Sequence, residues 1–161
     1  MHRVTIPTDD RMRALGRALA AELRAGDLVL LSGGLGAGKT TLTRGLGEGL
    51  DVRGAVTSPT FVIARVHPSL SGGPALVHVD AYRLTGLDDM EDLDLDVSLP
   101  ESVVVVEWGE GKVEDLSEDR LEVRIERSAE EGDEVRTVTL IPYGERWQTG
   151  ALAEVAAAAA V

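Results

Sequence analysis

The stretch LVLLSGGLGAGKTTL, residues 28–42, decides the fold of this chain. It opens with four apolar residues typical of a buried strand, breaks into glycines, and resumes as the first turns of a helix. A strand that passes through a glycine-rich turn into a helix is a recurrent building unit of α/β proteins. We therefore expect an α/β fold with this strand at its centre.

The turn matches the P-loop pattern Gly-x-x-x-x-Gly-Lys-Thr over residues 33–40. Glycines let successive backbone N–H groups point at a phosphate, and the helix that follows adds the positive end of its dipole. Lys39 supplies a mobile cation for the β- and γ-phosphates, and Thr40 offers a hydroxyl ligand to Mg²⁺. The predicted nucleotide-binding residues of the loop are Gly33, Gly34, Leu35, Gly36, Ala37, Gly38, Lys39, Thr40 and Thr41.

The composition limits the alternatives. With 161 residues, 43% of them apolar, the chain is long enough for one hydrophobic core and short for two, so we expect a single domain over residues 1–161. A net charge of −12 disfavours direct tight binding of nucleic acid and favours a protein partner. The absence of cysteine from the sequence excludes disulfides and thiolate chemistry.

The N-terminal segment lacks the apolar core of a signal peptide, and the sequence contains no run of membrane-spanning length. We therefore expect a cytoplasmic protein with no membrane association. His2, His67 and His78 share no metal-ligand spacing, which argues against a zinc site.

One amphipathic helix is expected before the central strand in the sequence, and another after it. The first covers residues 9–25, with Thr8 as its cap and an apolar stripe at Met12, Leu15, Leu19 and Leu23. Residues 8–12, which include Thr8 and Asp9, could lie near a bound base, but capping and packing explain them without any nucleotide and are the favoured interpretation. The second covers residues 39–50 and contains Gly45, Gly47 and Gly49, which imply either close packing or early fraying.

Two further apolar strands, residues 75–80 and 103–107, end in Asp80 and Glu107. A carboxylate at the carboxyl end of a parallel strand lies at the edge where a neighbouring loop binds phosphate, so either residue could complete a Mg²⁺ site. The all-valine run before Glu107 is typical of a strand covered on both faces.

Two loops are ambiguous from the residues alone. Thr57, Ser58, Pro59 and Thr60 read equally as a turn entering a strand or as a γ-phosphate sensor. The acidic segment 88–96 fits a solvated helix face or a docking surface.

Residues 121–127 and 135–141 alternate strictly and predict a C-terminal antiparallel hairpin, followed by a helix over residues 145–160.

Four blocks in this order and spacing resemble the TsaE family of small P-loop ATPases of bacterial tRNA threonylcarbamoyladenosine modification. They are GGLGAGKTT at 33–41, TSPTF at 57–61, HVDAYRL at 78–84 and VEWGE at 106–110. The resemblance implies a P-loop NTPase-like mixed sheet with helices on both faces. It also implies an ATPase that acts with the TsaB and TsaD proteins, where TsaD transfers the threonylcarbamoyl group to adenosine 37.

The resemblance further assigns residues. It places Mg²⁺ on Thr40 and Glu107, puts Asp80 near the metal and the γ-phosphate, and makes residues 57–60 a switch loop. The predicted catalytic residues are Lys39, Asp80 and Glu107, and the predicted metal ligands are Thr40, Glu107 and Asp80. A base-contacting hydroxyl or acid of the family would correspond to Thr8 or Asp9.

The main hypothesis is Mg²⁺-dependent ATP hydrolysis, slow in the isolated protein because the sequence offers no obvious general base. Three alternatives remain: a small-molecule kinase of the P-loop class, a GTPase-like switch, and an acidic adaptor with a structural nucleotide. The kinase would need a lid for which the chain has little sequence, and the sequence carries no Asn-Lys-x-Asp motif for guanine.

Overall fold

A computed structural model describes residues 2–33, 38–52, 64–80, 99–107, 119–127, 135–147 and 151–159. All statements about structure below concern these residues. None of the helices in these ranges is long and apolar enough to cross a membrane.

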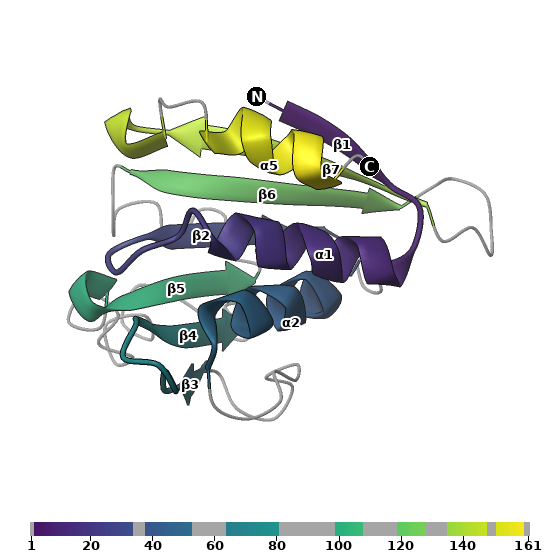
Figure 1. Ribbon diagram of the computed structural model, residues 1–161. Helices are drawn as coiled ribbons and strands as arrows, with labels where there is room; N and C mark the ends of the chain where they lie inside the picture. Colours follow the sequence, from purple (N-terminus) through teal and green to yellow (C-terminus); the bar gives the residue numbers. More distant parts are fainter. Residues whose placement is uncertain are drawn as a thin grey trace.

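The centre of the fold is a seven-stranded sheet with the order β1-β7-β6-β2-β5-β4-β3 (Figure 1). Strand β2 pairs in parallel with β5 on one side and with β6 on the other, and β4 pairs in parallel with β5. The pairs β1–β7, β6–β7 and β3–β4 are antiparallel, so the predicted mixed sheet is confirmed. The strands are β1 (His2–Ile6), β2 (Leu28–Ser32), β3 (Ala64–His67), β4 (Ala75–Asp80), β5 (Ser102–Glu107), β6 (Arg120–Arg127) and β7 (Arg136–Tyr143).

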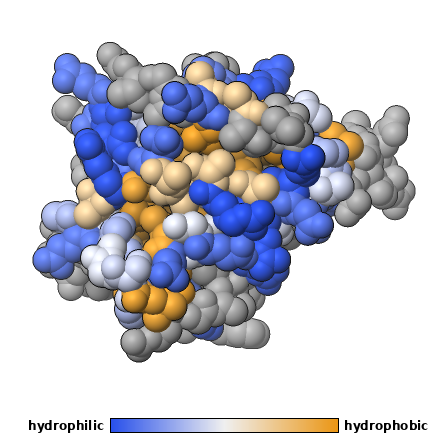
Figure 2. Space-filling model, viewed as in Figure 1, coloured by the Kyte–Doolittle hydropathy of each residue, from blue (hydrophilic) through white to orange (hydrophobic). Residues whose placement is uncertain are grey.

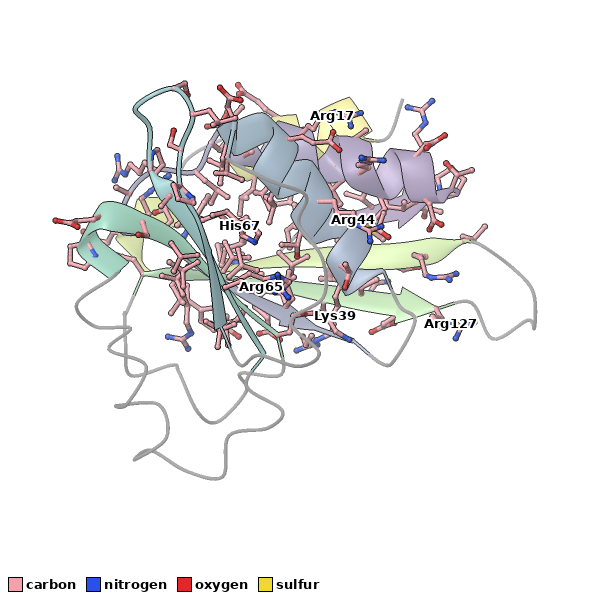
Figure 3. All side chains as sticks on the ribbon, turned by 90° about the horizontal axis from the view of Figure 1, so that it is seen from below. Arg17, Lys39, Arg44, Arg65, His67 and Arg127 are labelled. Carbon is pink, nitrogen blue, oxygen red and sulfur yellow. The ribbon has the colours of Figure 1, made fainter. Side chains whose placement is uncertain are left out.

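The three described helices, α1 (Asp9–Ala20), α2 (Lys39–Leu50) and α5 (Ala151–Ala159), lie on one face of this sheet (Figures 1 and 3). Their apolar stripes pack on alternate residues of the strands, among them Val29 and Leu31 of β2. Within the described ranges no helix lies on the opposite face, where helices were also predicted.

Burial explains why β2 and β5 take the central positions. Every residue of β5 is buried, as the valine run predicted, and so are the four apolar residues of β2. A strand buried on both faces has to be apolar on both faces. Charged and other hydrophilic residues cover much of the helix-bearing surface (Figure 2).

Two predicted boundaries were wrong. Helix α1 ends at Ala20 instead of residue 25, because the Asp27 carboxylate accepts the Arg24 N–H at 2.8 Å and Gly26 turns the chain at a φ of 96° into β2.

Residues 145–160 do not form one helix. Glu145–Trp147 is a 3-10 turn held by contacts of Arg146 and by burial of Trp147, and α5 begins at Ala151. The predicted C-terminal hairpin is confirmed as β6 and β7.

Helices α1 and α2 touch through backbone at glycine positions. A Cβ added at Gly45 would overlap the Arg13 carbonyl oxygen, and one added at Gly16 would overlap the Leu42 carbonyl oxygen. Gly49 likewise leaves no room beside Ala20. Gly45 and Gly49 of α2 therefore serve close packing rather than fraying.

An exposed cluster of ion pairs also joins α1 and α2. Glu48 of α2 accepts hydrogen bonds from Arg13 and, at 2.9 Å, from Arg17 of α1. Partial desolvation opposes the charge, but the two arginines outweigh it and hold the pKa of Glu48 below its ordinary value. Because the cluster is solvated, it contributes little to stability.

A buried ion pair joins the C-terminal segment to the start of β2. Arg146 donates to both oxygens of Asp27, at 3.1 and 3.0 Å, and to the Glu22 carbonyl oxygen at 2.6 Å. Asp27 is buried, and the Arg146 guanidinium also stacks on the Trp147 ring at 4.3 Å. This pair fixes the chain where it enters the central strand.

Replacing Gly45 with alanine is expected to destabilise the protein by about 1–3 kcal/mol, because the helices must move apart. Urea unfolding measures this loss. The control is Gly73→Ala, where the new methyl group would meet only Ser69 Oγ at 3.7 Å, so little change is expected. Equal stabilities for the two variants would contradict the close packing.

Replacing Arg146 with methionine is expected to cost about 3–5 kcal/mol, because the buried Asp27 charge loses its partner. The double variant Asp27→Asn with Arg146→Met should recover much of that loss, since no unpaired charge is then buried. Thermal and urea unfolding compare the two variants. A double variant less stable than Arg146→Met alone would show that this explanation is wrong.

Candidate functional site

The candidate site lies at the carboxyl ends of strands β2, β5 and β4, which are neighbours in the sheet. These strands run parallel, and the register pairs Leu31 with Glu107 and Glu107 with Asp80. The glycine-rich turn after β2 therefore begins beside the two predicted carboxylate positions. Three separate segments of the sequence meet at one edge.

Lys39 connects the two sides of the turn. It is the first residue of α2, only 7% exposed, and its Nζ donates a hydrogen bond to the Gly33 carbonyl oxygen at 2.7 Å. Gly38 caps the helix at a φ of 112°, which favours glycine. Figure 3 shows Lys39 at the end of the strands, below the helices. Gly34, Leu35, Gly36 and Ala37 lie outside the described residues.

The first turn of α2 presents the other predicted loop residues. Thr40 and Thr41 are half-buried there, and within the same helix Thr43 Oγ1 donates to the Lys39 carbonyl oxygen at 2.8 Å. Since the cap is a glycine, no side chain caps the N–H groups of this turn. Such a helix start is suited to binding an anion.

Glu107 makes a buried hydrogen bond that the sequence reasoning missed. Its Oε2 lies 2.8 Å from Nε2 of His78, and the two residues are 5% and 0% exposed. His78 and Glu107 come from neighbouring strands and lie on the face that carries the helices. The spacing of His78 two residues before Asp80, on a strand, was the available signal for a shared face.

Asp80 is placed by its backbone alone. It is the last residue of β4 and pairs in register with Glu107, while its side chain lies outside the described set. The predicted switch residues Thr57, Ser58, Pro59 and Thr60, and the acidic segment 88–96, also lie outside the described residues.

The start of α1 lies against Gly38, the last residue of the glycine-rich turn. A Cβ added at Gly38 would lie 3.3 Å from Cε of Met12, and Met12 N–H donates to the Thr8 carbonyl oxygen at 3.1 Å. Thr8 caps α1 as predicted, accepting the Arg11 N–H at 3.3 Å, and Asp9 is exposed. Contact of Thr8 or Asp9 with a base stays a prediction.

A second buried carboxylate, also missed from sequence, lies beside the end of β2. Glu122 is 7% exposed and interacts with Ser32 Oγ at 3.4 Å, Arg124 at 2.9 Å and the Tyr143 hydroxyl at 3.3 Å. Strict alternation had predicted an exposed face for this hairpin. The cluster instead holds Ser32, the residue directly before the turn, in place.

These features define a class of α/β protein in which a central parallel strand runs through a glycine-rich turn into a helix, beside acidic strand ends. The family model described as Threonylcarbamoyl adenosine biosynthesis protein TsaE matches residues 6–138. The chain belongs to the TsaE family.

Comparisons with individual proteins support the same family assignment. The tRNA threonylcarbamoyladenosine biosynthesis protein TsaE of Streptomyces coelicolor is 76% identical over 140 residues, which cover 86% of this chain and 95% of that protein. The protein of that name from Bacillus subtilis is 38% identical over 140 residues, covering 86% and 84%. The crystal structure of Bacillus subtilis YdiB superposes with a TM-score of 0.74 at 30% identity, covering 97% of this chain and 94% of that chain.

Proposed function

We propose that this protein binds and hydrolyses Mg²⁺·ATP at residues 33–41 in support of threonylcarbamoyladenosine formation at adenosine 37 of tRNA. Membership of the TsaE family supports the role in this tRNA modification. The site geometry supports the nucleotide chemistry, and the observation that carries it is the buried Lys39 held against Gly33 at the start of α2.

The residues fit a polyphosphate. A lysine with 7% exposure that is bonded to a carbonyl oxygen at 2.7 Å is a cation kept in a confined place. A phosphate oxygen is a stronger partner for such an ammonium group than a carbonyl oxygen. The helix start at Thr40 and Thr41 adds N–H donors and a favourable dipole on the same side.

The residues also fit a hard divalent cation. Thr40, Glu107 and Asp80 supply oxygen donors, which Mg²⁺ prefers, from α2, β5 and β4. When bound, Mg²⁺ would neutralise charge that develops on the β- and γ-phosphates. Thr40 and Glu107 hold the metal, Lys39 binds phosphate oxygens, and Asp80 orients water or ligands of the metal.

We further propose that the TsaB and TsaD proteins are the partners and that hydrolysis is slow without them. The net charge of −12 supports a protein partner over direct tight binding of tRNA. The same negative charge is consistent with an assembly in which this chain binds ATP and TsaD binds tRNA. A small-molecule kinase remains the competing class, and a phosphorylated product formed without partner proteins would identify it.

Replacing Lys39 with alanine is expected to lower ATPase activity in the presence of the TsaB–TsaD pair by about 100-fold or more. The variant loses a positively charged group that donates a hydrogen bond to the phosphate. Formation of threonylcarbamoyladenosine over repeated turnovers should fall with it. Steady-state phosphate release and nucleoside analysis of the tRNA measure the two effects.

A matched pair on β5 tests the metal assignment. Glu107→Gln should abolish Mg²⁺-dependent turnover, while Glu101→Gln, an exposed position just before the same strand, should leave it unchanged. Circular dichroism checks that both variants fold. Full support of the tRNA modification by Lys39→Ala or Glu107→Gln would disprove the proposed site.

A further inference from the structure

The buried pair of His78 and Glu107 has no obvious part in building the fold. The residues beside it on the same face of the sheet, Leu76 of β4 and Val105 of β5, are apolar and buried. A polar pair in such surroundings costs desolvation that an apolar pair of similar volume would avoid. Its place, at the strand ends beside the glycine-rich turn, suggests a purpose tied to the site.

The environment of the ring decides which group donates. Nδ1 of His78 is buried and has no hydrogen-bond partner among the residues that the structure describes. If Glu107 donated to Nε2, an N–H group would be buried at Nδ1 without an acceptor among the described residues. Buried orphan N–H groups are rarer than orphan acceptors. The tautomer that donates from Nε2 to Oε2 of Glu107 is therefore the favoured arrangement.

We propose that His78 is a positioning residue, which fixes the Glu107 carboxylate through Oε2 and so leaves Oε1 for the ligand shell of Mg²⁺. This inference rests on the proposed function. The ring is suited to the task because it is 0% exposed on β4, between its antiparallel partner β3 and its parallel partner β5. Hydrogen bonds that orient metal-ligating groups in this way are worth about 10–100-fold in metal affinity.

The first test measures the Mg²⁺ concentration that half-saturates binding of a fluorescent ATP analogue. We expect His78→Leu to raise it by about 10–100-fold. His78→Gln should stay close to wild type, because its amide nitrogen can replace Nε2 as the donor. His67→Leu is the control, since it removes a second buried histidine, on β3, and should leave the Mg²⁺ dependence unchanged.

The second test separates positioning from general packing. In a Glu107→Gln background, His78→Leu should change the Mg²⁺ dependence by no more than about twofold, because a residue that acts through Glu107 has nothing left to act on. An undiminished effect in that background would overturn the proposal. A wild-type Mg²⁺ dependence in His78→Leu would do so as well.

The third test needs neither metal nor folded variants of His78. Ring ¹⁵N spectra of the metal-free wild-type protein should show one histidine in the Nε2–H form whose signals move in Glu107→Gln. An Nδ1–H ring at His78 would overturn the proposal.

These tests also distinguish failure of the proposed function. If nucleotide binding by the wild-type protein is independent of Mg²⁺, the proposed function fails and the positioning role fails with it. If wild type and Glu107→Gln differ as expected while His78→Leu matches wild type, the positioning role alone is disproved.

Discussion

The parallel pairing of β2 with β5 and β6 is the constraint on which the rest of this structure depends. It puts the carboxyl ends of these strands at one edge of the sheet, so the turn after Ser32 begins beside Glu107. The pairing of β5 with β4 brings Asp80 and His78 to the same place. Because side chains alternate along a strand, a shift of one residue in β5 would turn Glu107 to the opposite face and separate it from His78.

The helix layer holds the turn from the other side. Backbone contact at Gly16 and Gly45 brings α1 close to α2, and Met12 packs against Gly38 at the start of α2. The Asp27–Arg146 ion pair fixes the entrance of β2. Sheet register, glycine packing and this ion pair thus locate Lys39, and the proposed role in phosphate binding requires such a defined position.

Buried polar groups lie on both sides of the end of β2. His78 and Glu107 occupy the helix-bearing face, and Glu122, which is bonded to the exposed Arg124, lies on the other. Each carboxylate has a side-chain hydrogen-bond partner, since a buried carboxylate left unpaired would be strongly destabilising. For a protein of the TsaE family, this arrangement keeps charge at the site without a loss of order.

The sequence by itself determined the elements whose signals are local. The 28–42 stretch predicted strand, turn and helix, and the alternation of the last hairpin predicted β6 and β7, because periodicity and glycine placement act over a few residues. The end of α1, the 3-10 turn at Arg146 and the partners of Glu107 and Glu122 depend on residues distant in the chain. Only the tertiary structure could decide these features, since strand register and helix packing determine which side chains meet, and neither is encoded in the spacing of residues along one segment.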